Sequence, residues 1–202
     1  MRIRKLIQFS LSLAIAAVSL VSANGQSKQP APFAATSRPE LALDFSYLRS
    51  NAPPNGCTCF NLYGGSATFA LPLARGPISA VADFTMAQSG SIASNAFSLR
   101  LATYELGARY EPQLHWHGLH PFGQVLAGVA HSSGSLVSGS GTSVSNASAA
   151  FAGSVGGGVD VALSRRIWVR IVQADYRPTT FDNGTNNHQN NLSLSSGIVI
   201  KF

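Results

Sequence analysis

Apolar and polar side chains alternate along most of the chain from Glu40 to the C-terminus. In the first such segment, for example, the apolar Leu43 and Phe45 flank the acidic Asp44. Because successive side chains of a β-strand point to opposite faces, a period of two predicts strands with one apolar and one polar face. Eight such segments are predicted: Leu41–Tyr47, Tyr63–Leu71, Ile78–Met86, Tyr104–Tyr110, Gln124–Val129, Phe151–Leu163, Ile167–Ile171 and Asn191–Phe202.

The connections between these predicted strands alternate in length. Long connections are expected at residues 49–60, 87–96, 132–148 and 177–190. Shorter ones fall between them at 74–77 and 164–166, and one of intermediate length at 111–119. Long loops at one end and short turns at the other, together with an even number of strands, are typical of membrane β-barrels.

The apolar face is assigned to the outside of the predicted barrel. The other face consists mostly of Gly, Ala, Ser and Thr, and only 11% of the chain is charged, whereas a water-soluble surface is normally about 25–35% charged. Small neutral residues suit the narrow lumen of eight strands. The sequence therefore predicts an all-β fold, an eight-stranded antiparallel up-and-down transmembrane β-barrel. A water-soluble barrel with its apolar face inside is the alternative.

The first 39 residues differ in composition from the rest. Basic residues precede an apolar stretch, Leu6–Leu20, and a small-residue segment that ends at Ala23. This order predicts a secretory signal peptide cleaved after Ala23, or alternatively after Gly25; a retained membrane anchor is the other interpretation. We expect a signal peptide over residues 1–23, a flexible periplasmic lead-in over 24–39 and the barrel over 40–202.

The formal net charge of +6 falls to +3 after cleavage, because the predicted signal peptide carries three basic residues and no acidic one. The remaining basic residues are scattered along the chain and form no cluster. Nucleic acid is therefore not an expected partner.

Two segments resemble known proteins. The alternation of Asn191–Phe202, ending on an aromatic residue, resembles the β-signal read by the outer-membrane assembly machinery, which implies that Phe202 is an assembly signal. Residues 40–202 resemble the small eight-stranded barrels of the outer-membrane-protein-A-like superfamily. Asn51–Phe60 is similar to first-loop sequences of acidobacterial outer-membrane barrels. We expect no peptidoglycan-binding domain after the barrel, so the wall-anchoring role of that superfamily is not implied.

Cys57 and Cys59 fall in a predicted surface loop of an exported protein, where oxidation is expected. They are candidates for a disulfide that staples the loop, although the small ring would be strained. A metal site or a reactive thiol pair is the alternative.

Three histidines, His115, His117 and His120, cluster around Trp116 after the fourth predicted strand. Their spacing could place two imidazoles on one metal ion. A periplasmic turn with an interfacial tryptophan explains the same residues, and it is the interpretation we favour.

His131 and Ser133 form the one pattern that suggests catalysis. Two residues apart on a strand, they share a face, and a histidine could activate a serine nucleophile. The eight-stranded lipid A deacylases resemble this arrangement, but they also use a downstream carboxylate. No acidic residue lies between His131 and Asp160, so the orienting group is missing from its expected place.

The polar face also carries seven charged residues, which are predicted to form an ion-pair network that fills the lumen: Asp44, Asp83, Glu105, Arg109, Asp160, Arg170 and Lys201. A narrow pore with these charges as selectivity residues is the alternative. With a three-residue turn at 164–166, Asp160 lies opposite Arg170 inside the barrel, near its periplasmic end. The same parity turns Gln173 and Asp175 outward unless a bulge near Val172 shifts the register.

The sequence thus favours a non-enzymatic outer-membrane barrel with a structural, loop-display or envelope-integrity role. A lipid A-modifying enzyme and a narrow pore are the alternatives. The expected partners are outer-membrane lipid and, during biogenesis, the assembly machinery; no cofactor is expected, and the sequence does not identify a partner for the extracellular loops.

Overall fold

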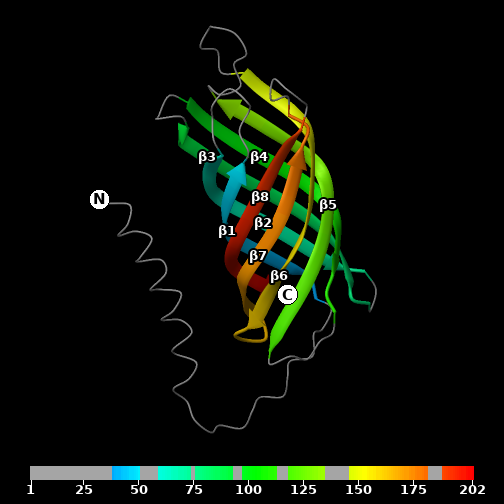
Figure 1. The fold of residues 1–202 in the computed structure, drawn as a ribbon. Helices are drawn as coiled ribbons and strands as arrows, with labels where there is room; N and C mark the ends of the chain where they lie inside the picture. The colour runs from blue at the N-terminus through cyan, green and yellow to red at the C-terminus, as the bar shows by residue number, and fades with distance from the viewer. Residues whose placement is uncertain are drawn as a thin grey trace, which may run out of the picture. The chain divides into compact units, whose positions relative to one another are not determined.

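The computed structural model describes residues 38–50, 59–73, 76–92, 97–112, 118–134, 146–181 and 188–202. Their strands are β1 (Glu40–Ser50), β2 (Phe60–Pro72), β3 (Ile78–Ile92), β4 (Phe97–Tyr110), β5 (Leu119–Gly134), β6 (Asn146–Ala162), β7 (Ile167–Thr179) and β8 (Gln189–Lys201). Neighbouring strands pair antiparallel, and β1 also pairs with β8, so the sheet closes into a barrel (Figure 1). The predicted fold class is confirmed. None of the described residues lies in a helix long and apolar enough to cross a membrane.

The predicted signal peptide and nearly all of the lead-in lie outside the described residues, so both boundaries stay predictions. The eight predicted strands are all present, but most are longer than the apolar pattern indicated. β3 continues to Ile92, through part of the predicted loop at 87–96, and β4 already begins at Phe97. The paired backbone continues past the point where large apolar side chains cease, because hydrogen bonds between strands do not depend on side-chain polarity.

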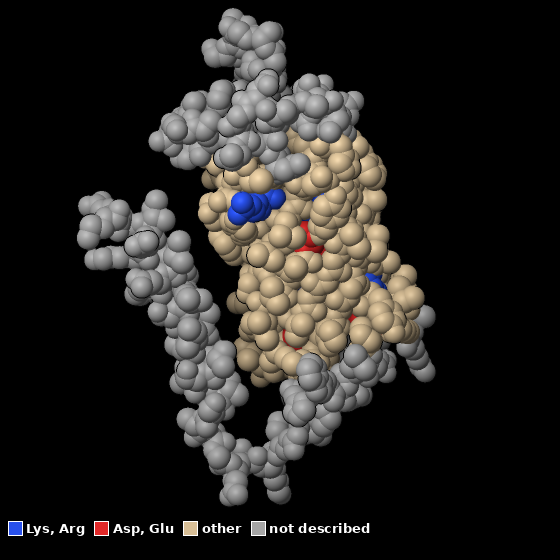
Figure 2. All heavy atoms as spheres, viewed as in Figure 1, with Lys and Arg blue, Asp and Glu red and all other residues tan. Residues whose placement is uncertain are grey.

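Large apolar side chains cover the outside of the barrel. Leu106, Val125 and Phe45 are 68%, 63% and 61% exposed, and Figure 2 shows one face of the molecule on which charged atoms are few. The charged side chains of the polar face are buried inside, as Arg170 with no exposed surface illustrates. The predicted assignment of faces is confirmed, whereas a water-soluble barrel would hold its apolar face inside.

The short connection between β6 and β7 sets their register. Leu163 N donates to the carbonyl oxygen of Ile167 at 3.1 Å, so these two residues flank the turn as predicted. The hydroxyl of Ser164 accepts hydrogen bonds from the backbone amides of Arg166 and Ile167 at 3.3 and 3.0 Å, which satisfies donors that the turn leaves unpaired.

A β-bulge in β7 realigns the second half of that strand. Relative to both β6 and β8, β7 holds one extra residue between Arg170 and Gln173. Ile171 and Val172 therefore both point outward, 51% and 45% exposed, and Gln173 and Asp175 point inward and are buried. The bulge near Val172 that the sequence required for these two polar side chains is present.

Candidate functional site

Arg170 on β7 lies among carboxylates inside the barrel, near the end that carries the short turns (the turn end). Its Nε and Nη2 donate to the two carboxylate oxygens of Asp160 on β6 at 3.0 and 3.2 Å. Its Nη1 donates to Asp44 Oδ2 on β1 at 3.0 Å and to Gln173 Oε1 at 2.9 Å. Because a guanidinium group presents its donors in a fixed fork, one arginine connects three strands. The predicted pairing of Asp160 with Arg170 is confirmed.

Arg109 on β4 forms a second cluster, with groups from the strand ends. It pairs with Glu40 at the start of β1, and its Nε and Nη2 donate to Gln124 Oε1 at 3.3 and 3.1 Å. Glu40 also pairs with Lys201 Nζ on β8 at 3.1 Å. Glu111, directly after β4, lies 3.9 Å from Arg109. Burial, followed by the negative charge of Glu40, raises the pKa of the Glu111 carboxyl.

Two aromatic rings pack against the cations of these clusters. The guanidinium carbons of Arg109 and Arg170 lie 4.3 and 4.6 Å from the ring centroid of Phe122. Lys201 Nζ lies 3.8 Å from the ring centroid of Trp168. Such contacts are worth about 0.5–2 kcal/mol each. Phe122 and Trp168 therefore stabilise buried cations as well as filling space.

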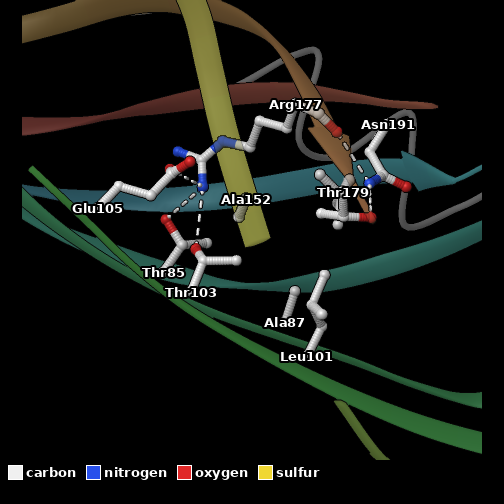
Figure 3. A pocket seen from close by; sticks show the side chains of 10 residues that line it. Thr85, Ala87, Leu101, Thr103, Glu105, Ala152, Arg177, Thr179 and Asn191 are labelled. Atoms are coloured by element: carbon white, nitrogen blue, oxygen red, sulfur yellow. Dashed lines mark hydrogen bonds and ion pairs between the residues drawn. The ribbon is translucent and has the colours of Figure 1, made fainter. Parts of the chain in front are cut away.

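Arg177 on β7 is the centre of a third cluster inside the barrel, and Figure 3 shows its side chain pointing toward Glu105 and Thr85. It lies 3.3 Å from Asp83, 3.4 Å from Glu105 and 3.9 Å from Asp175. Its Nη1 also donates to the hydroxyls of Thr85 on β3 and Thr103 on β4, at 3.1 and 3.2 Å. One guanidinium group therefore offsets three buried carboxylates from three strands.

The structure places all seven charged residues that the sequence assigned to the lumen inside the barrel: Asp44, Asp83, Glu105, Arg109, Asp160, Arg170 and Lys201. The predicted network left out Glu40, Asp175 and Arg177, although the sequence indicated that a bulge near Val172 would turn Asp175 inward. Glu40 shares the even parity of Asp44, which could have identified it. Asp175 and Arg177 lie beyond the bulge, where a strict period of two assigns them to the wrong face.

An apolar layer lies above the charged clusters, at the end that carries the long loops (the loop end). Leu48, Phe60, Leu62, Leu101 and Phe181 are its large buried members. Between Leu101 of this layer and Arg177 lies a cavity of only about 10 Å³ (Figure 3). A single water molecule needs roughly 10–15 Å³, so this level of the interior has no room for a solute.

Comparison with known proteins identifies the fold. No family model matches the chain, and no curated protein matches its sequence. Neisserial surface protein A, a solved structure, matches with a TM-score of 0.62 at 13% identity, over 81% of this chain and 97% of that chain. The chain has the fold of the small eight-stranded outer-membrane barrels. The attachment invasion locus protein Ail of Yersinia pestis matches with a TM-score of 0.52 at 12% identity, over 82% and 99% of the two chains. Ail in complex with the heparin analogue sucrose octasulfate matches with a TM-score of 0.51 at the same identity and coverage.

The candidate pair His131 and Ser133 lies on the outer face of β5, as the shared parity predicted. His131 is exposed, and its ring lies 6.1 Å from that of Tyr104 in an edge-to-face contact. No described carboxylate is exposed on this outer face. Among the described residues, the pair therefore has no acidic side chain to orient the histidine.

His115 and His117 lie outside the described residues. His120 lies within β5 and is half-buried, with its ring 4.4 Å from the ring of Trp168. The described part of the chain holds no group of three potential metal ligands. The weak alternative of a metal site at these three histidines stays untested.

Cys59 is exposed and forms no disulfide with a described residue. Its candidate partner Cys57 lies outside the described residues, as does most of the acidobacterial-like segment, so both predictions remain open. Phe202 is 62% exposed, and its backbone amide donates to the carbonyl oxygen of Pro39 at 3.0 Å. This bond fastens the predicted assembly signal to the beginning of the described chain.

Proposed function

We propose that this chain is an integral outer-membrane barrel that is closed to solutes and acts as a non-enzymatic scaffold, displaying loops or contributing to envelope integrity. One observation carries the proposal: apolar side chains cover the outside, and ion-paired charges fill the inside. Exposed Leu, Val and Phe are compatible with lipid chains, and charges can be buried inside because each has a partner of opposite charge that offsets the cost of removing it from water. The strands, of 11 to 17 residues, meet the roughly 9–11 that a tilted strand needs to cross a bilayer.

Membrane fractionation tests the location. The protein should appear in the outer-membrane fraction and migrate faster on a denaturing gel before boiling than after it, because a folded barrel resists detergent. The mass of the mature protein should correspond to cleavage after Ala23. Recovery in the soluble fraction, or in the inner membrane, would overturn the proposal.

A narrow pore is the rival that the interior argues against. The Arg177 cluster and the apolar layer around Leu62 and Leu101 fill successive levels of the lumen. Purified protein in planar bilayers should therefore give no conductance steps. Regular single-channel openings by the wild-type protein would contradict the closed scaffold.

A lipid-modifying enzyme is the second candidate, because His131 and Ser133 share the face that would meet lipid. The lack of an exposed described carboxylate speaks against it, since an imidazole without an orienting acid is a weaker base. Lipid A incubated with the wild-type protein should keep all its acyl chains. Deacylation that is lost in His131→Ala and in Ser133→Ala would establish the enzyme instead.

A further inference from the structure

The exposed charged side chains in the described part of the chain all have one sign. Every charged side chain that the structure describes as exposed is an arginine: Arg38, Arg49, Arg100, Arg165 and Arg166. Arg49 on β1 and Arg100 on β4 lie toward the loop end, and the other three lie at the turn end. No described carboxylate pairs with Arg100. An exposed guanidinium group that pairs with none of the described carboxylates is open to an external anion.

Arg100 belongs to a polar row that crosses four strands. In the sheet register Tyr63 on β2 faces Gln88 on β3, Gln88 faces Arg100, and Arg100 faces Ser133 on β5. All four are exposed or half-buried, and they line parts of an outer hollow of about 690 Å³. Guanidinium, amide and hydroxyl groups therefore offer hydrogen-bond donors side by side.

Toward the middle of the barrel the same face becomes apolar and recessed. The next row holds Gly65 and Met86, and the one after it Ala67 and Phe84. These residues line a second hollow, of about 430 Å³, which shares Tyr63, Gln88 and Arg100 with the first. Each two-residue step along a strand covers about 6.6 Å. The two hollows thus form one groove, polar toward the loop end and apolar below.

We propose that this groove, on the outer face of β2 to β5, binds an anionic, phosphate-bearing lipid. Its phosphate lies against Arg100 and the polar row, and one acyl chain lies along Gly65, Ala67 and Met86. A guanidinium fork matches phosphate oxygens, and small outward residues leave room that larger side chains would fill. The inference rests on the proposed membrane location, which would put the polar row at the headgroup level of the leaflet on the loop side.

Native mass spectrometry of the full-length protein in detergent tests the groove. The protein is titrated with phosphatidylglycerol or with phosphatidylcholine that carries the same acyl chains, and the first binding constant is measured. The wild type should prefer phosphatidylglycerol. Arg100→Gln should weaken phosphatidylglycerol binding about fivefold, the effect of one arginine at a membrane surface, and leave phosphatidylcholine unchanged. Inorganic phosphate alone should not compete, because it lacks the chain that fills the apolar part.

Two further variants separate the groove from general surface charge. Arg49→Gln removes the other loop-end arginine, which lines neither hollow, and should leave the preference intact. Ala67→Leu should weaken both lipids by a similar factor, because it fills the acyl-chain part. An unchanged constant in Arg100→Gln, or an equal loss in Arg49→Gln, would overturn the site. Heat-modifiable migration of each variant shows whether its barrel is folded. A variant that folds and fractionates with the outer membrane but loses the lipid preference has lost the groove, whereas failure of the proposed membrane location would show in the fractionation of the wild type.

Discussion

Removing the guanidinium group of Arg170 should destabilise the barrel more than removing the carboxylate of Asp160. Arg170 has no exposed surface and lies within 3.2 Å of oxygens from Asp160, Asp44 and Gln173. Arg170→Met leaves the buried carboxylates of Asp160 and Asp44 without the cation that pairs with both, a loss of about 3–5 kcal/mol. Asp160→Asn leaves Asp44 paired with Arg170, so only charge-assisted hydrogen bonds weaken, at a cost of about 1.5–3 kcal/mol.

Equilibrium urea unfolding of the protein refolded into phospholipid vesicles measures both costs. Arg166→Met, in the exposed turn next to β7, is the matched control and should stay within about 0.5 kcal/mol of the wild type. Adding Asp160→Asn to Arg170→Met should restore part of the lost stability, because it removes one uncompensated charge. If Asp160→Asn costs as much as Arg170→Met, or if the two changes are additive, Arg170 is not the shared centre that its geometry indicates.

Three further predictions concern the wall and the terminus of the barrel. Val155→Arg, in the middle of β6 and 51% exposed, should cost about 2–4 kcal/mol in vesicles, whereas Val155→Leu should be nearly neutral; equal effects would contradict the lipid-facing assignment. Gly197→Ala should cost about 1–3 kcal/mol, because its Cβ would meet the backbone oxygen of Leu43 and the side chain of Asp44, whereas Gly90→Ala meets nothing within 4 Å; comparable urea midpoints would refute the close approach. Deleting Phe202 should lower the amount of barrel inserted in cells while leaving refolding into vesicles nearly unchanged, and normal insertion would argue against an assembly signal.

The sequence was sufficient for the wall of the barrel and less so for its interior. Alternation alone assigned Asp160 and Arg170 to the lumen, and the length of the turn at 164–166 then made them partners, as observed. The sequence could not show that Asp44 completes this cluster. Asp44 on β1 comes within hydrogen-bond distance of Arg170 on β7 only because the barrel closes. Arg177 was missed for a local reason: a single bulged residue reverses the parity of every later position in the strand.

The bulge itself gives a sharp test of this parity argument. In β7, Arg170 points inward, Ile171 and Val172 point outward, and Gln173 points inward again. Deleting Val172 leaves one outward residue between two inward ones, so regular alternation is restored and Gln173 keeps its face and its partner on β6. Such a protein should still fold and show heat-modifiable migration.

Deleting Ala174 from the same strand is the matched control. It removes one residue from a regular stretch, so Asp175 and Arg177 would turn toward lipid, which costs about 2–4 kcal/mol for an arginine near the midplane. Glu105 and Asp83 would at the same time lose their cation inside. The variant without Ala174 should therefore fail to form a heat-modifiable barrel, although both deletions shorten β7 by one residue. If the variant without Val172 failed equally, the extra residue would do more than set the parity of β7, and the account of the interior given by alternation and one bulge would be wrong.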